Sequence, residues 1–116
     1  MKLKKIKTLY DEINSQFFDD LLPFSHIRVT KNKRKFGQFY IRRNYSIIEL
    51  NLDMIIKCEY DIKEILIHEM CHLWQDETLE TEPENEHDKY FLDKLFSICY
   101  TLKILPKHAK DYYEYD

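Results

Sequence analysis

Apolar residues near the start of the chain recur every three or four positions. At about 100° per residue they fall within one arc of a helix. The residues of this arc are Leu3, Ile6, Leu9, Tyr10, Ile13, Phe17 and Leu21. Leu22-Pro23 follows, and the position before a proline disfavours helical backbone angles. The pattern therefore predicts an amphipathic helix over residues 2–22.

Three short segments after this proline alternate between apolar and polar side chains, which is the pattern of half-buried strands. They cover residues 26–30, 36–41 and 45–52, with turns at 31–35 and 42–44. Gly37, the only glycine of the chain, lies within the second segment. A glycine at such a place indicates a bulge or the close approach of another group. We expect a small three-stranded antiparallel sheet.

Two further helices are predicted in the second half. Asp61 followed by Glu64 has the spacing of a capping box, so a helix should begin near Ile62. The acidic segment 76–88 reads as a loop. A last helix should begin between residues 84 and 87 and stop at Pro106, leaving residues 111–116 loosely held. The order helix, three strands, helix, helix predicts an α+β fold with helices against one face of the sheet.

Length and cysteine content narrow the class of protein. The chain has 116 residues, which is the size of a single domain, so we expect one domain over residues 1–116. No apolar run approaches the roughly 20 residues that cross a bilayer. The three cysteines are an odd number without a CxxC pair, which argues against a disulfide framework or a Cys-based zinc site. Free cysteines are typical of a reducing compartment, and we expect the cytoplasm.

The net charge of −3 hides an asymmetry. Residues 1–57 carry 12 Lys or Arg and 6 Asp or Glu, whereas residues 58–116 carry 6 and 15. The stretch 28–43 has no acidic residue and interleaves basic with aromatic side chains. Such a stretch could bind single-stranded nucleic acid, or it could be a solvated sheet edge. The sequence pI of about 5.9 favours the solvated edge, so we expect DNA association to be weak at most.

Residues 66–75, LIHEMCHLWQ, contain the one strong chemical motif. His68 and His72 are four residues apart, so on a helix both imidazoles face one point, and Glu69 leans toward it. This is HExxH, in which two histidines bind zinc and the glutamate acts as general base. The motif lies on the predicted helix beside its apolar arc, which suits a helix behind an active site.

A catalytic zinc also needs a third protein ligand. His26 and His108 are too loosely placed in the sequence to be nominated. His87 is the preferred candidate, because it opens the last predicted helix and Phe91 follows one turn later to anchor that helix. The alternative is a carboxylate from Glu82, Glu84 or Glu86, since zinc accepts both donor types.

The order of these features resembles the SprT-like domain, the zincin module of the Spartan-type proteases, over almost the whole chain. The features are an N-terminal helix ending at Leu22-Pro23, Phe36-Gly37 on a strand, Ile48–Leu52, ILIHEMCHLWQ, and His87-Asp-Lys-Tyr-Phe91. The last segment takes the place of the family's His-Gly-x-x-Phe, with Asp88 where glycine is usual. The Cys-rich ribbon and DNA-docking tails of many relatives are missing. The resemblance implies a zincin-like fold and metalloprotease chemistry, and it does not imply crosslink repair.

The sequence thus predicts a zinc-dependent peptidase acting on protein or peptide substrates. Zn²⁺ would be held by His68, His72 and His87, with Glu69 as the general base. An extended substrate could pair with the strand that carries Gly37. The group that stabilises the oxyanion stays unassigned, with Tyr90, His108, Tyr112 and Tyr113 as candidates. Two rival interpretations are an inactive zinc-binding scaffold and a nucleic-acid module that uses residues 28–43.

Overall fold

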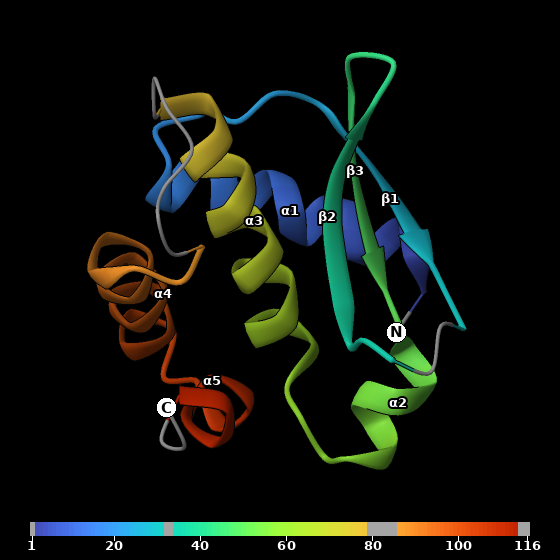
Figure 1. Cartoon of the computed structure of the whole chain (residues 1–116), viewed down its shortest axis with the longest axis vertical. Coiled ribbons are helices and arrows are strands. Elements are labelled where there is room, and N and C mark those ends of the chain that lie inside the picture. The colour runs from blue at the N-terminus through green and yellow to red at the C-terminus, as the bar shows by residue number, and fades with distance from the viewer. Residues whose placement is uncertain (1, 32–33, 79–85, 114–116) are drawn as a thin grey trace.

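The computed structural model describes residues 2–31, 34–78 and 86–113, and of residues 111–113 only the backbone. In these ranges the chain forms five helices and three strands (Figure 1). They are α1 (Leu3–Phe17), β1 (Ser25–Val29), β2 (Gly37–Arg42), β3 (Tyr45–Leu50), α2 (Leu52–Lys57), α3 (Ile62–Thr78), α4 (Lys89–Thr101) and α5 (Lys107–Tyr113). The expected α+β class is confirmed.

The sheet is mixed, so the predicted all-antiparallel sheet is wrong. Its strand order is β1-β3-β2. Ile48 at the centre of β3 faces Ile27 of the parallel strand β1 and Phe39 of the antiparallel strand β2. The chain passes from β1 to the opposite edge of the sheet, and β3 then returns between the two earlier strands. Alternating polarity locates a strand and its buried face but says nothing about which neighbour it takes.

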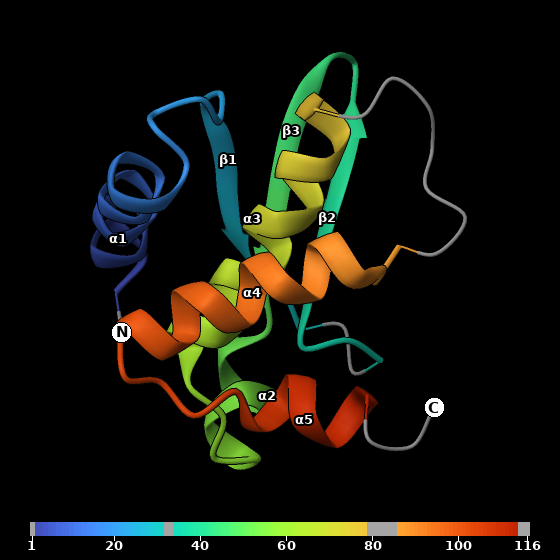
Figure 2. The ribbon, with the colours of Figure 1, turned by 90° about the vertical axis from the view of Figure 1, so that its left-hand side faces the viewer.

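Helix α3 lies between the sheet and α4, as Figures 1 and 2 show from two directions. The inner face of the sheet contributes Ile27, Ile48 and Leu50 to a core that continues into α3 through Ile65 and Leu66. The core also takes in Ile6, Tyr10 and Ile13 of α1 and Phe91, Leu95 and Ile98 of α4. A helix packed between two layers must be apolar on most of its surface, and this explains why the sequence around HExxH is so hydrophobic.

The start of α3 shows only half of the predicted capping box. The helix begins at Ile62, and Asp61 Oδ1 accepts a hydrogen bond of 2.8 Å from the backbone N–H of Lys63. Glu64 does not reach back toward Asp61. Its carboxylate oxygens instead accept the backbone N–H groups of His108 and Ala109, at 2.9 and 2.8 Å. Glu64 therefore binds backbone amides of α5, which is distant in the sequence, and not the backbone amide at the start of its own helix.

Several predicted boundaries are corrected by the structure. The helix predicted over residues 2–22 covers only Leu3–Phe17, because Asp19 and Asp20 take positive φ angles that a helix cannot contain. The third strand ends at Leu50, because α2 begins two residues later behind Asn51, whose side chain caps it through the backbone N–H of Met54. Helix α3 continues to Thr78 rather than ending before the acidic segment. Helix α4 begins at Lys89, and residues 111–113 belong to α5 rather than to a loose tail. Both unpredicted helices, α2 and α5, are too short to show a periodic apolar pattern.

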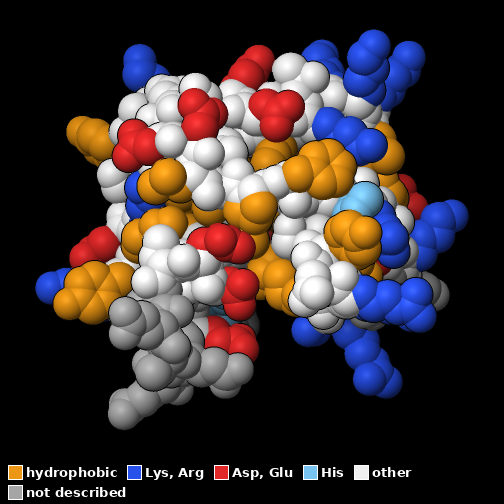
Figure 3. Space-filling view, turned by 90° about the horizontal axis from the view of Figure 1, so that it is seen from above, with side chains coloured by type: hydrophobic (Ala, Val, Ile, Leu, Met, Phe, Trp, Pro, Cys, Tyr) orange, Lys and Arg blue, Asp and Glu red, His pale blue; other side chains and the backbone are white. Residues whose placement is uncertain are grey.

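Charge is distributed unevenly over the surface. In the view from above (Figure 3), most of the visible Lys and Arg side chains gather on the side of the sheet, and most Asp and Glu side chains lie over the helices. The asymmetry between the two halves of the sequence therefore becomes an asymmetry between two sides of the molecule. No described helix is long and apolar enough to cross a membrane.

Candidate metal centre

Three histidines converge at one point between α3 and the start of α4. His68 and His72 come from successive turns of α3, and His87 comes from the segment just before α4. One ligand nitrogen from each lies within 4.8 Å of the others. The Nε2 atoms of His72 and His87 are 3.2 Å apart. The structure therefore brings the preferred third histidine to the HExxH pair.

Phe91 and Asp88 fix where His87 sits. The Asp88 side chain caps α4 by accepting the backbone N–H of Phe91 at 2.9 Å. The Phe91 ring is fully buried, and its centroid lies 5.1, 4.6 and 5.0 Å from the rings of His68, His72 and His87. The expected anchoring role of Phe91 is visible in these contacts. Asp88, which departs from the usual glycine, acts here as an N-cap.

Two of the histidines, His68 and His72, have lowered pKa values, which favours the neutral form that metal binding requires. Burial, followed by the neighbouring imidazoles, lowers the pKa of His68 well below its usual value. Burial and the nearby His87 lower the pKa of His72 to about 4. A histidine with a lowered pKa is uncharged at neutral pH, so a ring nitrogen keeps its lone pair for a cation.

Gln75 orients one of these rings. Its amide oxygen lies 3.2 Å from Nδ1 of His72, and an amide oxygen can only accept, so Nδ1 carries the hydrogen. The lone pair of His72 is then on Nε2, the atom that faces His87. Ligand histidines commonly have their other nitrogen fixed in this way. Sequence reasoning missed Gln75, although its position three residues after His72 on a helix was a usable signal.

The donor set fits zinc. Two nitrogens bound to one tetrahedral Zn²⁺ at about 2.0–2.1 Å would lie roughly 3.3 Å apart, close to the 3.2 Å between His72 and His87. Nδ1 of His68 is buried and has no hydrogen-bond partner among the described residues. A buried polar atom without a partner is unfavourable, and three converging imidazoles suit zinc better than the hard cations that prefer oxygen.

Glu69 is buried against the first residue of β2. An added Cβ on Gly37 would lie 2.9 Å from Cγ2 of Ile65 and 3.0 Å from Oε2 of Glu69. Of the two expectations for this glycine, the close approach of another group is confirmed. Burial raises the pKa of Glu69 to about 8, while Lys35 and a backbone hydrogen bond from Phe39 oppose the rise. The carboxyl group is thus fixed between α3 and the sheet.

The other candidates from the sequence lie in different places. Glu86 is exposed and is not part of the three-histidine cluster, and Glu82 and Glu84 fall outside the described residues. His26 lies on β1, where its ring contacts those of Phe24 and Tyr45.

Four residues were candidates for stabilising the oxyanion, and the structure describes the side chains of two of them, Tyr90 and His108. Tyr90 is 74% exposed and therefore makes little contact with the rest of the molecule. The side chains of Tyr112 and Tyr113 are outside the described part of the structure. The ring of His108 has its centroid 5.8 Å from that of His68.

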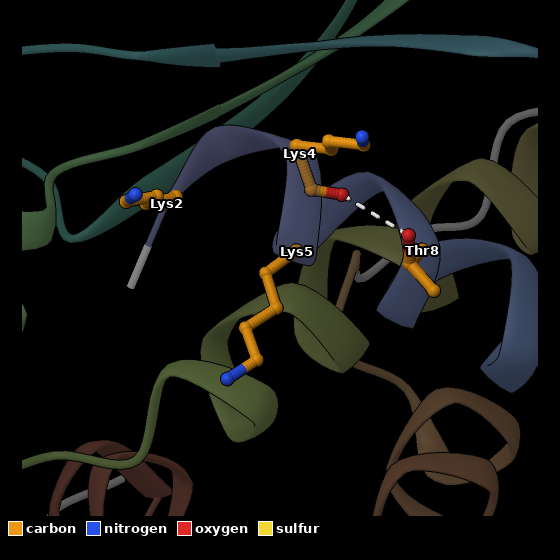
Figure 4. A pocket seen from close by; sticks show the side chains of 4 residues that line it. All are labelled: Lys2, Lys4, Lys5 and Thr8. Atoms are coloured by element: carbon orange, nitrogen blue, oxygen red, sulfur yellow. Dashed lines mark hydrogen bonds between the residues drawn. The ribbon is translucent and has the colours of Figure 1, made fainter.

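A separate hollow lies beside the start of α1. Lys2, Lys4, Lys5 and Thr8 line it. In Figure 4 the three lysine side chains point in different directions, and the Thr8 hydroxyl donates to the Lys4 carbonyl at 3.1 Å. Charges that diverge in this way do not form an anion site, so this hollow offers no competing chemistry.

We predict that Gly37→Ala destabilises the protein by roughly 1–3 kcal/mol, because the new methyl group would overlap Ile65 and press on Glu69. Urea unfolding measures the effect. Gln38→Ala, one residue along the same strand and facing the opposite side of the sheet, is the matched control and should cost less. Equal stability of Gly37→Ala and the wild type would show that Glu69 and Ile65 can move aside.

Comparison with known proteins gives one match. The model of the SprT-like family matches residues 6–109, nearly the whole chain. No curated protein and no solved structure matches the chain. The match includes α3, the His87 segment and the beginning of α5, so the three converging histidines and Glu69 all lie within it. The chain belongs to the SprT-like family.

Proposed function

We propose that this protein is a zinc-dependent metallopeptidase. The observation that carries the proposal is the convergence of three imidazoles, from His68, His72 and His87, on the helix face where the buried Glu69 directly follows His68. Membership of the SprT-like family, which is associated with metalloprotease activity, supports the same chemistry.

The residues have distinct roles in this proposal. His68, His72 and His87 hold the metal, and Gln75 keeps His72 in the required tautomer. Bound zinc supplies a Lewis acid that polarises the scissile carbonyl and makes water more acidic. Glu69 accepts a proton from the attacking water and delivers it to the nitrogen of the departing amine. Its fixed position against Gly37 and Phe39 favours that transfer, because a proton moves only over hydrogen-bond distance.

We propose that an extended peptide substrate pairs with β2. This strand is at an edge of the described sheet, and its first residue, Gly37, contacts Glu69. A peptide that adds to the free edge by backbone hydrogen bonds would run past the carboxyl group. Backbone pairing recognises any extended chain, so we expect unfolded proteins and flexible peptides to be better substrates than compact domains.

We predict about one zinc per chain in the purified protein, and a strong loss of bound zinc in His87→Ala. Removal of one of three ligands leaves only two protein donors, too few for a stable site. Elemental analysis after dialysis measures the metal. His26→Ala is the control, since His26 lies on β1 among Phe24 and Tyr45, and it should keep full occupancy. Full zinc in His87→Ala, with loss on substitution of Glu82, Glu84 or Glu86, would identify a carboxylate as the third ligand.

We predict that Glu69→Gln keeps zinc and fold but abolishes peptide cleavage. Glutamine preserves the shape of the side chain and removes the base. Cleavage of fluorescein-labelled casein, measured together with zinc content, tests this outcome. Zinc binding by a wild type that cleaves neither casein nor a broad peptide library would favour the inactive scaffold.

Nucleic-acid binding is expected to be minor. The described exposed basic side chains of residues 28–43 lie on or next to β1 and β2, and they are those of Arg28, Lys31, Arg34, Lys35, Arg42 and Arg43. The overall charge of the chain is negative. We predict weak, salt-sensitive and sequence-independent binding of single- and double-stranded oligonucleotides, measured by fluorescence anisotropy at low and physiological salt.

Two variants, each with three basic residues changed to Glu, test which basic side chains bind the oligonucleotides. Arg34, Lys35 and Arg42 changed to Glu should remove the weak binding, and Lys2, Lys4 and Lys5 changed to Glu should affect it less. All six side chains are exposed, so both variants should fold. Tight binding that survives physiological salt and is lost only in the first variant would favour the nucleic-acid module.

A further inference from the structure

Among the described residues, Glu64 is the one fully buried carboxylate that has no role in the candidate metal centre. It is four residues before His68, so it lies one turn below that histidine on the same side of α3. Both of its oxygens accept backbone N–H groups from the first turn of α5, those of His108 and Ala109. A carboxylate at a helix N-terminus satisfies amides that have no partner within the helix. Glu64 therefore fastens α5 to the helix that carries HExxH.

This attachment places His108 beside the candidate metal centre. The centroid of its ring is 5.8 Å from that of His68, and the two rings meet edge to face. Its Nδ1 is 3.8 Å from Oε2 of Glu64. Phe36 and Tyr60 contact the same ring, at centroid distances of 5.0 and 5.1 Å. The imidazole is thus held on several sides, while 18% of the side chain stays exposed to solvent.

His108 is next to the three-histidine cluster but is not a member of it. Nδ1 is 3.8 Å from Oε2 of Glu64, which is too long for a hydrogen bond, so Glu64 does not fix the ring hydrogen on Nδ1. With its hydrogen on Nε2, an imidazole beside a metal centre can donate to a substrate oxygen on which negative charge develops. Donors that are held in place before the reaction are effective, because they need no reorganisation.

We propose that His108 is a catalytic hydrogen-bond donor that contacts the carbonyl oxygen of the scissile peptide bond and stabilises its negative charge. The proposal rests on the metallopeptidase function proposed above. His108 forms and breaks no covalent bond in this role, and its proton stays on the ring. Helix α5, which the sequence pattern did not predict, then has a function: it completes the site that α3 and His87 begin.

The alternative is that His108 only packs against Phe36 and Tyr60. Two substitutions separate packing from hydrogen bonding. His108→Phe keeps an aromatic ring and loses the donor, whereas His108→Gln keeps a donor and loses the ring. Lys110→Ala, on the same helix and exposed, is the control for effects on α5 in general.

The first measurement is cleavage of fluorescein-labelled casein by the zinc-loaded variants. His108→Phe should lower kcat by about 10²–10³-fold with little change in KM or zinc content, as for the loss of one oxyanion donor. His108→Gln should recover part of kcat, and Lys110→Ala should match the wild type. Equal losses in the Phe and Gln variants would overturn the proposal, because packing alone would then explain the effect.

The second measurement does not depend on activity. The protein is loaded with Co²⁺, and its affinity for acetohydroxamate, an oxygen ligand, is followed by visible absorption. His108→Phe should weaken this affinity about 10- to 100-fold, the value of a hydrogen bond to a charged group, and His108→Gln should restore most of it. Circular dichroism of each variant shows whether it is folded. If His108→Phe is unfolded, the comparison of His108→Gln with the wild type still tests the proposal.

The two measurements separate the two proposals. A wild type that cleaves nothing, but whose acetohydroxamate affinity falls in His108→Phe and recovers in His108→Gln, would support the placement of His108 and contradict the peptidase function. Cleavage by the wild type with unchanged kcat and unchanged acetohydroxamate affinity in His108→Phe would overturn the role of His108 and leave the peptidase function standing.

Discussion

Helix α3 buries four polar side chains in the middle of the molecule, and each of them needs a partner there. Glu64, His68, Glu69 and Gln75 are each at most 7% exposed. Burial of a polar group without a hydrogen bond is unfavourable by about 1–3 kcal/mol, and more for a charged group. The elements around α3 supply partners from outside the helix. Glu64 binds the first amides of α5, and Glu69 lies against Gly37 and accepts a backbone hydrogen bond from Phe39.

The two remaining polar side chains, Gln75 and His68, lie at the histidine cluster. Gln75 accepts from His72, and Nδ1 of His68 has no hydrogen-bond partner among the described residues. Converging imidazoles, one of them with a buried unpartnered nitrogen, are unfavourable in a core and suit a metal ion. A metal bound in such a site would contribute to folding, because its ligands come from two elements, α3 and the segment just before α4. We therefore expect the contact between α3 and the start of α4 to depend on the bound ion.

Strand β2 and helix α5 both contribute residues to the surroundings of the candidate metal centre. Gly37 lets β2 approach α3 closely enough to confine Glu69, and β2 is an edge strand of the described sheet. Helix α5 brings His108 toward His68 from the other end of the chain. Residues from β2, α3, the start of α4 and α5 thus meet around one point, although 72 positions separate Gly37 from Ala109. Helices and a strand hold all of these groups except His87, which lies just before α4, and this favours a fixed geometry over adjustment on binding.

The sequence by itself determined the features that depend on near neighbours. The start of α3, the stacking of His68 and His72 on one face, and the positions of the strands all follow from repeats of two, three or four residues. The sequence also made His87 the preferred third histidine, since Phe91 follows it by one turn. Only the tertiary structure decided which strands pair, because β1 and β2 have similar alternation and either could have flanked β3 on the same side. It alone also decided the partner of Glu64. The local capping box and the distant amides of α5 compete for one carboxylate, and the chain's packing, which no local spacing encodes, favours the distant pair.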